Sequence, residues 1–128
     1  MTKTGNNKHR YDLEDRTLKY AKNINAYVNK LPKTISNNEN GKQLIRAGGS
    51  VGANYIEANE ALSKKDFLMR IKISRKETKE SRYWLELTNS LTKYQKEKEY
   101  LIQEATELMN IFGSILIKCK DKVLNIRN

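Results

Sequence analysis

The chain has 128 residues, enough for one hydrophobic core but short for two ordinary domains. Hydrophobic residues make up 38% of it, and no apolar run approaches the ~18 residues that a membrane span needs. Lysine and arginine number 25 against 15 acidic residues, and the net charge of +10 favours anionic partners. We therefore expect one soluble, basic domain with no membrane partner.

The N-terminal segment contains no apolar stretch of the kind that a signal peptide requires, and a single cysteine, Cys119, excludes an intrachain disulfide. Both features favour a cytoplasmic location. Residues 1–11 are polar and aperiodic, and we expect them to form a flexible arm. The folded domain is then predicted over residues 12–128.

Two helical patterns occupy the first half of this domain. The first begins at Asp12 and ends before Pro32, which stops a helix. A linker rich in turn-forming residues follows over 33–42, and the second pattern runs from about Asn40 to Ala61. The apolar side of the first pattern consists of Thr17, Ala21, Ile24, Val28 and Leu31.

Two more helical patterns complete the chain. Ser63 and Asp66 are spaced like an N-cap and its N3 carboxylate, which predicts a third helix from Ser63 to about Thr92. The fourth carries a heptad-like stripe, on which a buried structural Cys119 is expected. Its members are Leu101, Ala105, Leu108, Phe112, Ile115, Cys119 and Val123. We predict an all-α, antiparallel up-and-down four-helix bundle.

Three glycines lie within the second pattern, in RAGGSVGANY over 46–55. This stretch matches neither phosphate-loop signature and follows no predicted strand, so we exclude a nucleotide loop. On a helix, Gly48 and Gly52 share one side with Ile45 and Ile56. Each interior glycine costs a helix about 1 kcal/mol, which close approach of another helix would offset. We expect a continuous helix; a break near Gly48 is the alternative, and whether the glycines meet a helix of the same or a neighbouring subunit stays open.

The sequence contains few residues that could form a catalytic site. The one histidine, His9, falls in the expected arm, which argues against a histidine-containing di-iron site or a nucleophile–histidine pair. Two acidic pairs occur at helical i,i+3 spacing, Glu57 with Glu60 and Glu77 with Glu80, but ion pairs with basic neighbours are the favoured interpretation over cation binding. We predict no enzymatic activity, no cofactor and no metal.

The third helix carries two separate apolar stripes where a monomeric surface helix needs one. The first consists of Phe67, Ile71, Ser74, Thr78 and Leu85, and is the expected core seam. The second consists of Met69, Ile73, Trp84, Leu87 and Leu91. We predict that this second stripe and the side formed by Gly48, Gly52 and Ile56 serve self-association or helix packing. Packing of the second stripe against the diagonal helix is the alternative.

The rest of the third helix is strongly basic. It carries Lys64 and Tyr83, with Glu86 as its only acid, and six predicted phosphate contacts: Lys65, Lys72, Arg75, Lys76, Lys79 and Arg82. Such a one-sign face can neutralise several phosphates of RNA or DNA, and an interspersed aromatic ring can stack on an exposed base. A solvated lysine surface is the alternative.

The central sequence resembles the bacterial four-helix bundle proteins first noticed in intervening sequences of large-subunit ribosomal RNA genes. The resemblance covers about residues 10–122 and is most specific in the central forty. It rests on Ser50, Gly52, Ala53, Asn54 and Glu57, on Ser63-Lys64-Lys65-Asp66-Phe67, and on Lys72, Lys76-Glu77, Glu80 and Tyr83-Trp84-Leu85. The chain departs from many relatives at Gly48-Gly49, where alanine or serine is usual.

This resemblance implies a ring-like homopentamer with no recognised enzymatic activity. The related accessory proteins of diversity-generating retroelements bind nucleic acid and a reverse transcriptase, so RNA, DNA and a reverse transcriptase or other protein are the partners implied. We therefore expect a non-enzymatic oligomer that binds nucleic acid through the basic face of its third helix. The alternative is a structural or protein-interaction module with no direct nucleic acid role.

Overall fold

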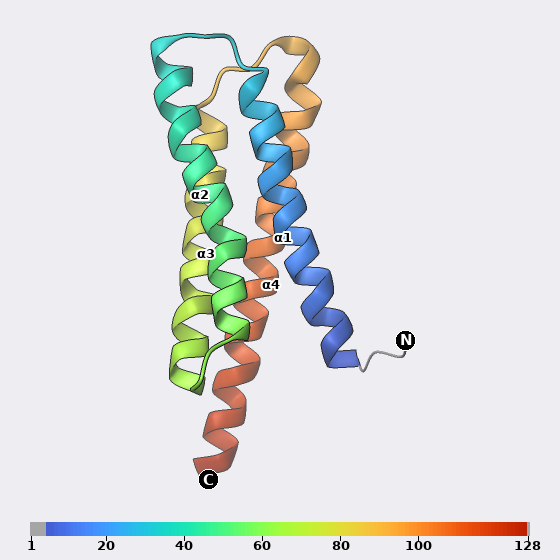
Figure 1. The fold of residues 1–128 in the computed structure, drawn as a ribbon, viewed down its shortest axis with the longest axis vertical. Coiled ribbons are helices and arrows are strands. Elements are labelled where there is room, and N and C mark those ends of the chain that lie inside the picture. The colour runs from blue at the N-terminus through green and yellow to red at the C-terminus, as the bar shows by residue number, and fades with distance from the viewer. Residues whose placement is uncertain (1–4, 128) are drawn as a thin grey trace.

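The computed structural model describes the backbone of residues 5–127 and the side chains of residues 13–120. This part of the chain forms four α-helices and one short 3-10 turn, without a strand. They are α1 (Gly5–Asn29), α2 (Ile35–Asn59), α3 (Lys64–Leu87), η1 (Thr92–Tyr94) and α4 (Gln95–Arg127). The helices run alternately up and down, each packs on the next, and α4 returns beside α1 (Figure 1). The predicted four-helix bundle is confirmed at the level of one chain.

Both helices of the first half begin earlier than the sequence indicates. The first starts at Gly5 instead of Asp12. The arm predicted over 1–11 falls partly on residues 1–4, which lie outside the described residues, and its flexibility stays a prediction. The second starts at Ile35 instead of Asn40, because Thr34 is its N-cap and accepts a hydrogen bond from the Asn37 backbone nitrogen at 3.1 Å. The linker is therefore much shorter than 33–42.

The third helix has the predicted start but an earlier end. Ser63 is its N-cap, with Oγ accepting from the Asp66 nitrogen at 3.1 Å. The helix ends at Leu87 and not near Thr92, because Thr88 adopts an extended backbone. Its Oγ1 donates to the Leu85 carbonyl at 2.6 Å, and its own carbonyl accepts from Lys98 Nζ at 2.8 Å.

A buried asparagine joins the two connections at this end of the bundle. The Asn37 side chain donates to the Asn89 carbonyl at 3.0 Å and accepts from the Asn89 nitrogen at 2.9 Å. It also donates to the Pro32 carbonyl at 2.9 Å. The α1–α2 and α3–α4 connections are thus held together by hydrogen bonds, which fixes where α3 must stop.

Gly48 and Gly52 lie inside one continuous helix, as predicted, and they face α1 of the same chain. A Cβ atom at Gly48 would lie 2.6 Å from Cδ1 of Ile24, and one at Gly52 would lie 2.9 Å from Oγ1 of Thr17. The glycine side is therefore a close contact within the bundle. Ile56 does not share this packing, since half of its surface is exposed.

Hydroxyl groups cross the core between α1 and α3. The hydroxyl of Tyr20 lies 2.7 Å from Ser81 Oγ, and that of Tyr27 lies 2.7 Å from Thr88 Oγ1. All four residues are buried. The first apolar stripe of α3 lines this interior as predicted: Ile71, Ser74, Thr78 and Leu85 are fully buried, and Phe67 packs on the core while partly exposed.

The side chains of α4 that face the core become less buried along the second half of the helix. Leu108 and Phe112 are fully buried, whereas Ile115 and Cys119 are only partly buried. Cys119 is therefore not the buried residue that its place on the stripe predicted, because α1 diverges from the bundle at this end (Figure 1). No helix among the described residues is both long and apolar enough to span a bilayer.

Candidate nucleic-acid interface

The predicted basic face lies on the outer side of α3. Five of the six predicted phosphate contacts have exposed side chains: Lys65, Lys72, Arg75, Lys76 and Lys79. The opposite side of the same helix is the buried stripe that contains Ser74 and Thr78. The stretch between Lys65 and Lys79 is about 20 Å long at the rise of an α-helix. The structure therefore brings these cations together in one row.

The lysines of this row are free to meet an external anion. Lys65, Lys72 and Lys79 form no ion pair with any residue whose side chain the structure describes. An incoming phosphate therefore does not have to break an existing salt bridge at these positions. This is the electrostatic condition under which lysines contribute to phosphate binding.

Two arginines lie at the margin of the row that borders α4. Arg82 is partly buried, and its Nη1 donates to Thr106 Oγ1 at 3.1 Å. The Arg75 guanidinium passes over Gly113, where an added Cβ would lie 3.6 Å from its Nε. Arg82 thus already uses one donor for a hydrogen bond within the bundle, unlike the exposed lysines.

Tyr83 is the aromatic residue of the same surface. Its side chain is 57% exposed. Its ring contacts that of Trp84, with centroids 5.1 Å apart and planes at 75°. Trp84 is itself partly buried and packs against the core. The exposed ring is therefore supported by a residue anchored in the bundle.

The charged side chains on the flank of α3 that faces α2 are paired, unlike the lysines of the row. Arg46 Nη1 lies 3.3 Å from Glu77 Oε2, and Arg70 Nη1 donates to Asn54 Oδ1 at 3.0 Å. A hydrogen bond with the Glu77 carboxylate raises the pKa of Glu80. The sequence indicated that Glu77 pairs with a base, but the partner is on α2.

The carboxylates of this flank are not gathered into a cluster of three or more possible metal ligands within the described part of the chain. Trp84 Nε1 is buried and has no hydrogen-bond partner within the described part of the chain, and neither has Glu77 Oε1 while Glu80 is ionised. Two buried polar atoms are thus unsatisfied on this flank.

The second apolar stripe of α3 is largely uncovered. Met69, Leu87 and Leu91 are 47%, 41% and 46% exposed. Leu91 is not on α3 as predicted, because the helix ends at Leu87 and Leu91 lies in the connection before η1. Ile73 and Trp84 are partly buried, and Trp84 packs on the core. Contact with the chain's own core therefore accounts for Trp84 but not for the three exposed residues.

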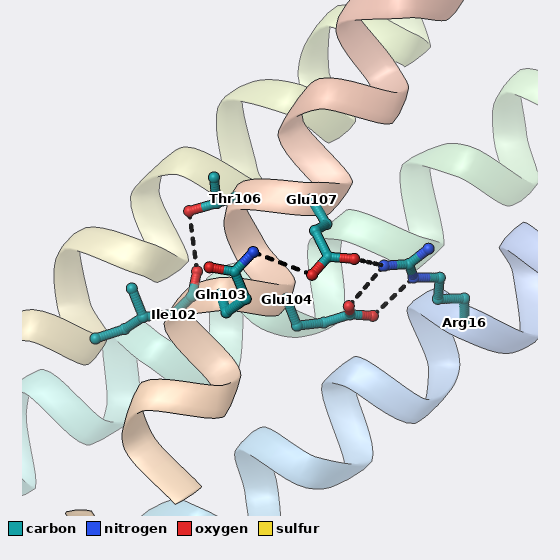
Figure 2. Close-up of polar contacts among 6 residues, drawn as sticks. All are labelled: Arg16, Ile102, Gln103, Glu104, Thr106 and Glu107. Carbon is teal, nitrogen blue, oxygen red and sulfur yellow. Dashed lines mark hydrogen bonds and ion pairs between the residues drawn. The ribbon is translucent and has the colours of Figure 1, made fainter. Parts of the chain in front are cut away.

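Ion pairs between α1 and α4, here called the polar clamp, are not predictable from the sequence pattern. Arg16 donates to both carboxylate oxygens of Glu104, at 2.8 and 2.7 Å, and to Glu107 at 3.0 Å (Figure 2). Lys30 and Glu97 form a second bridge of 2.7 Å between the same helices. These partners are distant in the sequence, so their pairing follows only from the arrangement of α1 beside α4.

Two comparisons relate the chain to known proteins. The family model of the 23S rRNA-intervening sequence protein matches residues 10–114. A crystal structure of a protein with unknown function from the S23 ribosomal protein family of Bacteroides thetaiotaomicron VPI-5482 is 32% identical, with a TM-score of 0.65. The similarity covers 80% of this chain and 96% of that one. No curated protein sequence matches significantly.

Proposed function

The chain belongs to the 23S rRNA-intervening sequence protein family, and from this premise we propose that it is a non-enzymatic protein that binds RNA or DNA through the basic face of α3. The contacts are phosphate contacts by Lys65, Lys72, Arg75, Lys76, Lys79 and, at the margin, Arg82. Because lysine binds phosphate as a point charge, this face carries little sequence discrimination of its own.

The observation that carries the proposal is the row of exposed, unpaired lysines. Lys65, Lys72 and Lys79 lie on one side of a rigid helix and have no acidic partner among the described residues. Arg46 and Arg16, by contrast, are paired with glutamates elsewhere on the bundle. The unpaired lysines of α3 therefore form a row of positive charge that a polyanion can reach.

A salt titration tests this function. Fluorescence anisotropy of a labelled RNA and of a labelled DNA is followed with wild-type protein from about 50 mM salt upward. We expect binding at low salt whose logarithmic affinity falls linearly with the logarithm of salt, with a slope of roughly −3 to −5 for four to six phosphates. No binding of either nucleic acid at about 50 mM salt would contradict the proposal.

We also propose that copies of the chain associate, as a ring-like homopentamer by family resemblance. The exposed residues Met69, Leu87 and Leu91 support self-association, since a monomer gains nothing from a second apolar stripe. In a ring the basic face would be repeated, which raises the avidity for a long polyanion.

The second candidate is a structural or protein-interaction module with no direct nucleic acid role. Glu77 Oε1 and Trp84 Nε1 favour it, because buried polar atoms without partners are expected to be satisfied in an assembly. A reverse transcriptase or another protein is the partner that this alternative implies. It predicts an oligomer whose weak affinity for nucleic acid does not depend on the lysines of α3.

A further inference from the structure

We infer that the basic face of α3 takes unpaired nucleotides, with one base stacked on the ring of Tyr83 while the flanking phosphates lie on Lys79 and Lys76. This inference rests on the proposed function and names the class of nucleic acid that the site prefers. It assigns to Tyr83 a role distinct from that of the lysines, because a phenol ring contributes no positive charge.

The first support is the position of the ring in the row. Tyr83 follows Lys79 by four residues and Lys76 by seven, so the three side chains lie on one side of α3 over two helical turns. All three are exposed. A base and the phosphates next to it can therefore be contacted by neighbouring side chains of one helix.

The second support is the geometry of the ring. The Tyr83 and Trp84 planes meet at 75°, an edge-to-face arrangement. Such a contact uses at most one face of the Tyr83 ring, so at least one face is left to other partners. Because 57% of the side chain is exposed, a nucleobase can reach it.

The third support is that the ring is held in place before binding. Trp84 packs against the hydrophobic core, and its centroid lies 5.1 Å from that of Tyr83. A ring supported in this way loses less conformational freedom when a base stacks on it than an isolated surface tyrosine would. No other aromatic ring contacts Tyr83 within the described part of the chain.

Stacking distinguishes unpaired from paired strands. In a duplex both faces of each base are covered by its neighbours, so an aromatic ring on the protein surface gains nothing unless a base leaves the stack. In a single strand, loop or bulge the face of a base is available, and every base has such a face. The lysines bind the phosphates of either form, and Tyr83 adds affinity for the unpaired form only.

The experiment compares one labelled single strand and one labelled duplex of the same length, by anisotropy at one salt concentration. The variants are Tyr83→Ala, Tyr83→Phe and the control Tyr100→Ala, which removes an equally exposed tyrosine from α4. We expect Tyr83→Ala to weaken single-strand binding about tenfold and to leave duplex binding unchanged. Tyr83→Phe and Tyr100→Ala should match wild type on both.

A second readout uses Trp84, the only tryptophan of the chain. A base stacked on the neighbouring ring should quench its fluorescence when the single strand binds, and the quenching should be absent in Tyr83→Ala. Light scattering of Tyr83→Ala shows whether Tyr83 instead contacts another protein chain. A changed mass with unchanged single-strand affinity would overturn the inference.

The failures of the two proposals are distinguishable. If wild type binds neither the single strand nor the duplex, the proposed function fails and this inference fails with it. If wild type binds both and Tyr83→Ala binds the single strand as well as wild type does, only the stacking role is overturned. If Tyr83→Ala loses as much affinity for the duplex as for the single strand, the stacking role is also contradicted, since the substitution then weakens nucleic acid binding in general.

Discussion

Gly48 of α2 lies directly against Ile24 of α1, so closely that a β-carbon on the glycine would be 2.6 Å from the isoleucine Cδ1. Ile24 is fully buried and cannot move aside freely. Gly49, the next residue, is exposed, and nothing lies within 4 Å of an added β-carbon there. Two adjacent glycines in one helix therefore have opposite packing environments.

This contrast predicts opposite outcomes for the same substitution. Gly48→Val should lower the free energy of unfolding by about 2 kcal/mol, because it overpacks the α1–α2 contact. Gly49→Val should leave it unchanged or raise it by up to about 0.5 kcal/mol, because valine is a better helix former than glycine. Urea denaturation followed by circular dichroism measures both. Equal effects of the two substitutions would mean that α1 does not pack on Gly48.

The buried phenol of Tyr20 predicts a loss of stability at high pH. Burial raises the pKa of Tyr20 from 10.0 to about 12, so the folded protein holds this proton more tightly than the unfolded chain. Relative to the ionised side chain, protonated Tyr20 therefore adds about 2–3 kcal/mol to the free energy of unfolding. This difference is complete below pH 10 and is lost as the pH rises towards about 12.

Tyr20→Phe provides the control for this titration. The variant cannot lose a proton there, and Ser81 keeps its hydrogen bond to the Thr78 carbonyl. At about pH 8 we expect wild type to be the more stable by about 1 kcal/mol, from the lost hydrogen bond. Its advantage should vanish or reverse above pH 10, as measured by denaturation midpoints. A constant difference at every pH would show that Tyr20 is not buried as described.

The clamp between α1 and α4 predicts a local effect of Arg16 (Figure 2). Arg16→Met should lower the free energy of unfolding by about 1 kcal/mol, because a bidentate, partly exposed pair to Glu104 is lost. Hydrogen exchange should accelerate in α1 more than in α3. Lys42→Met is the control, since its pair with Glu39 is exposed and spaced 3.8 Å. If both variants behave alike, the clamp does not hold α1.

The second stripe of α3 predicts association of chains. Light scattering of wild type at micromolar concentration should give a multiple of the chain mass, five if the family resemblance extends to assembly. Leu87→Asp should lower that mass, because it places a charge on a surface that must lose water in the interface. Leu62→Asp, at a fully exposed loop position, is the matched control. A monomeric wild type would contradict the two-stripe argument.

The helices and the core seam of α3 followed from the sequence because they depend on local spacing. Ser63 was identifiable as an N-cap, and the row from Lys65 to Lys79 as one surface, from helical periodicity alone. The end of α3 at Leu87 could not be predicted in this way, since it depends on hydrogen bonds between Asn37 and Asn89 across the bundle. Long-range polar contacts of this kind leave no periodic signal in a single sequence.

The sequence pattern of residues 46–55 predicts only part of their structure. Its phase predicted a continuous helix with Gly48 and Gly52 on one side, and this is confirmed. The helix they face, α1, could not be deduced, because the pattern of α2 contains no information about its neighbour. Ile56 was grouped with them by spacing, yet it is half exposed because the α1 contact is centred on the glycines.

The central claim is that the lysines of α3 bind nucleic acid, and charge reversal tests it most directly. One triple variant changes Lys72, Lys76 and Lys79 to glutamate; the control changes Lys19, Lys22 and Lys33, which are exposed away from α3, and so alters the net charge equally. We predict that the α3 variant loses binding by at least about 100-fold at about 50 mM salt, while the control loses much less. Equal affinities of the two variants would contradict the account.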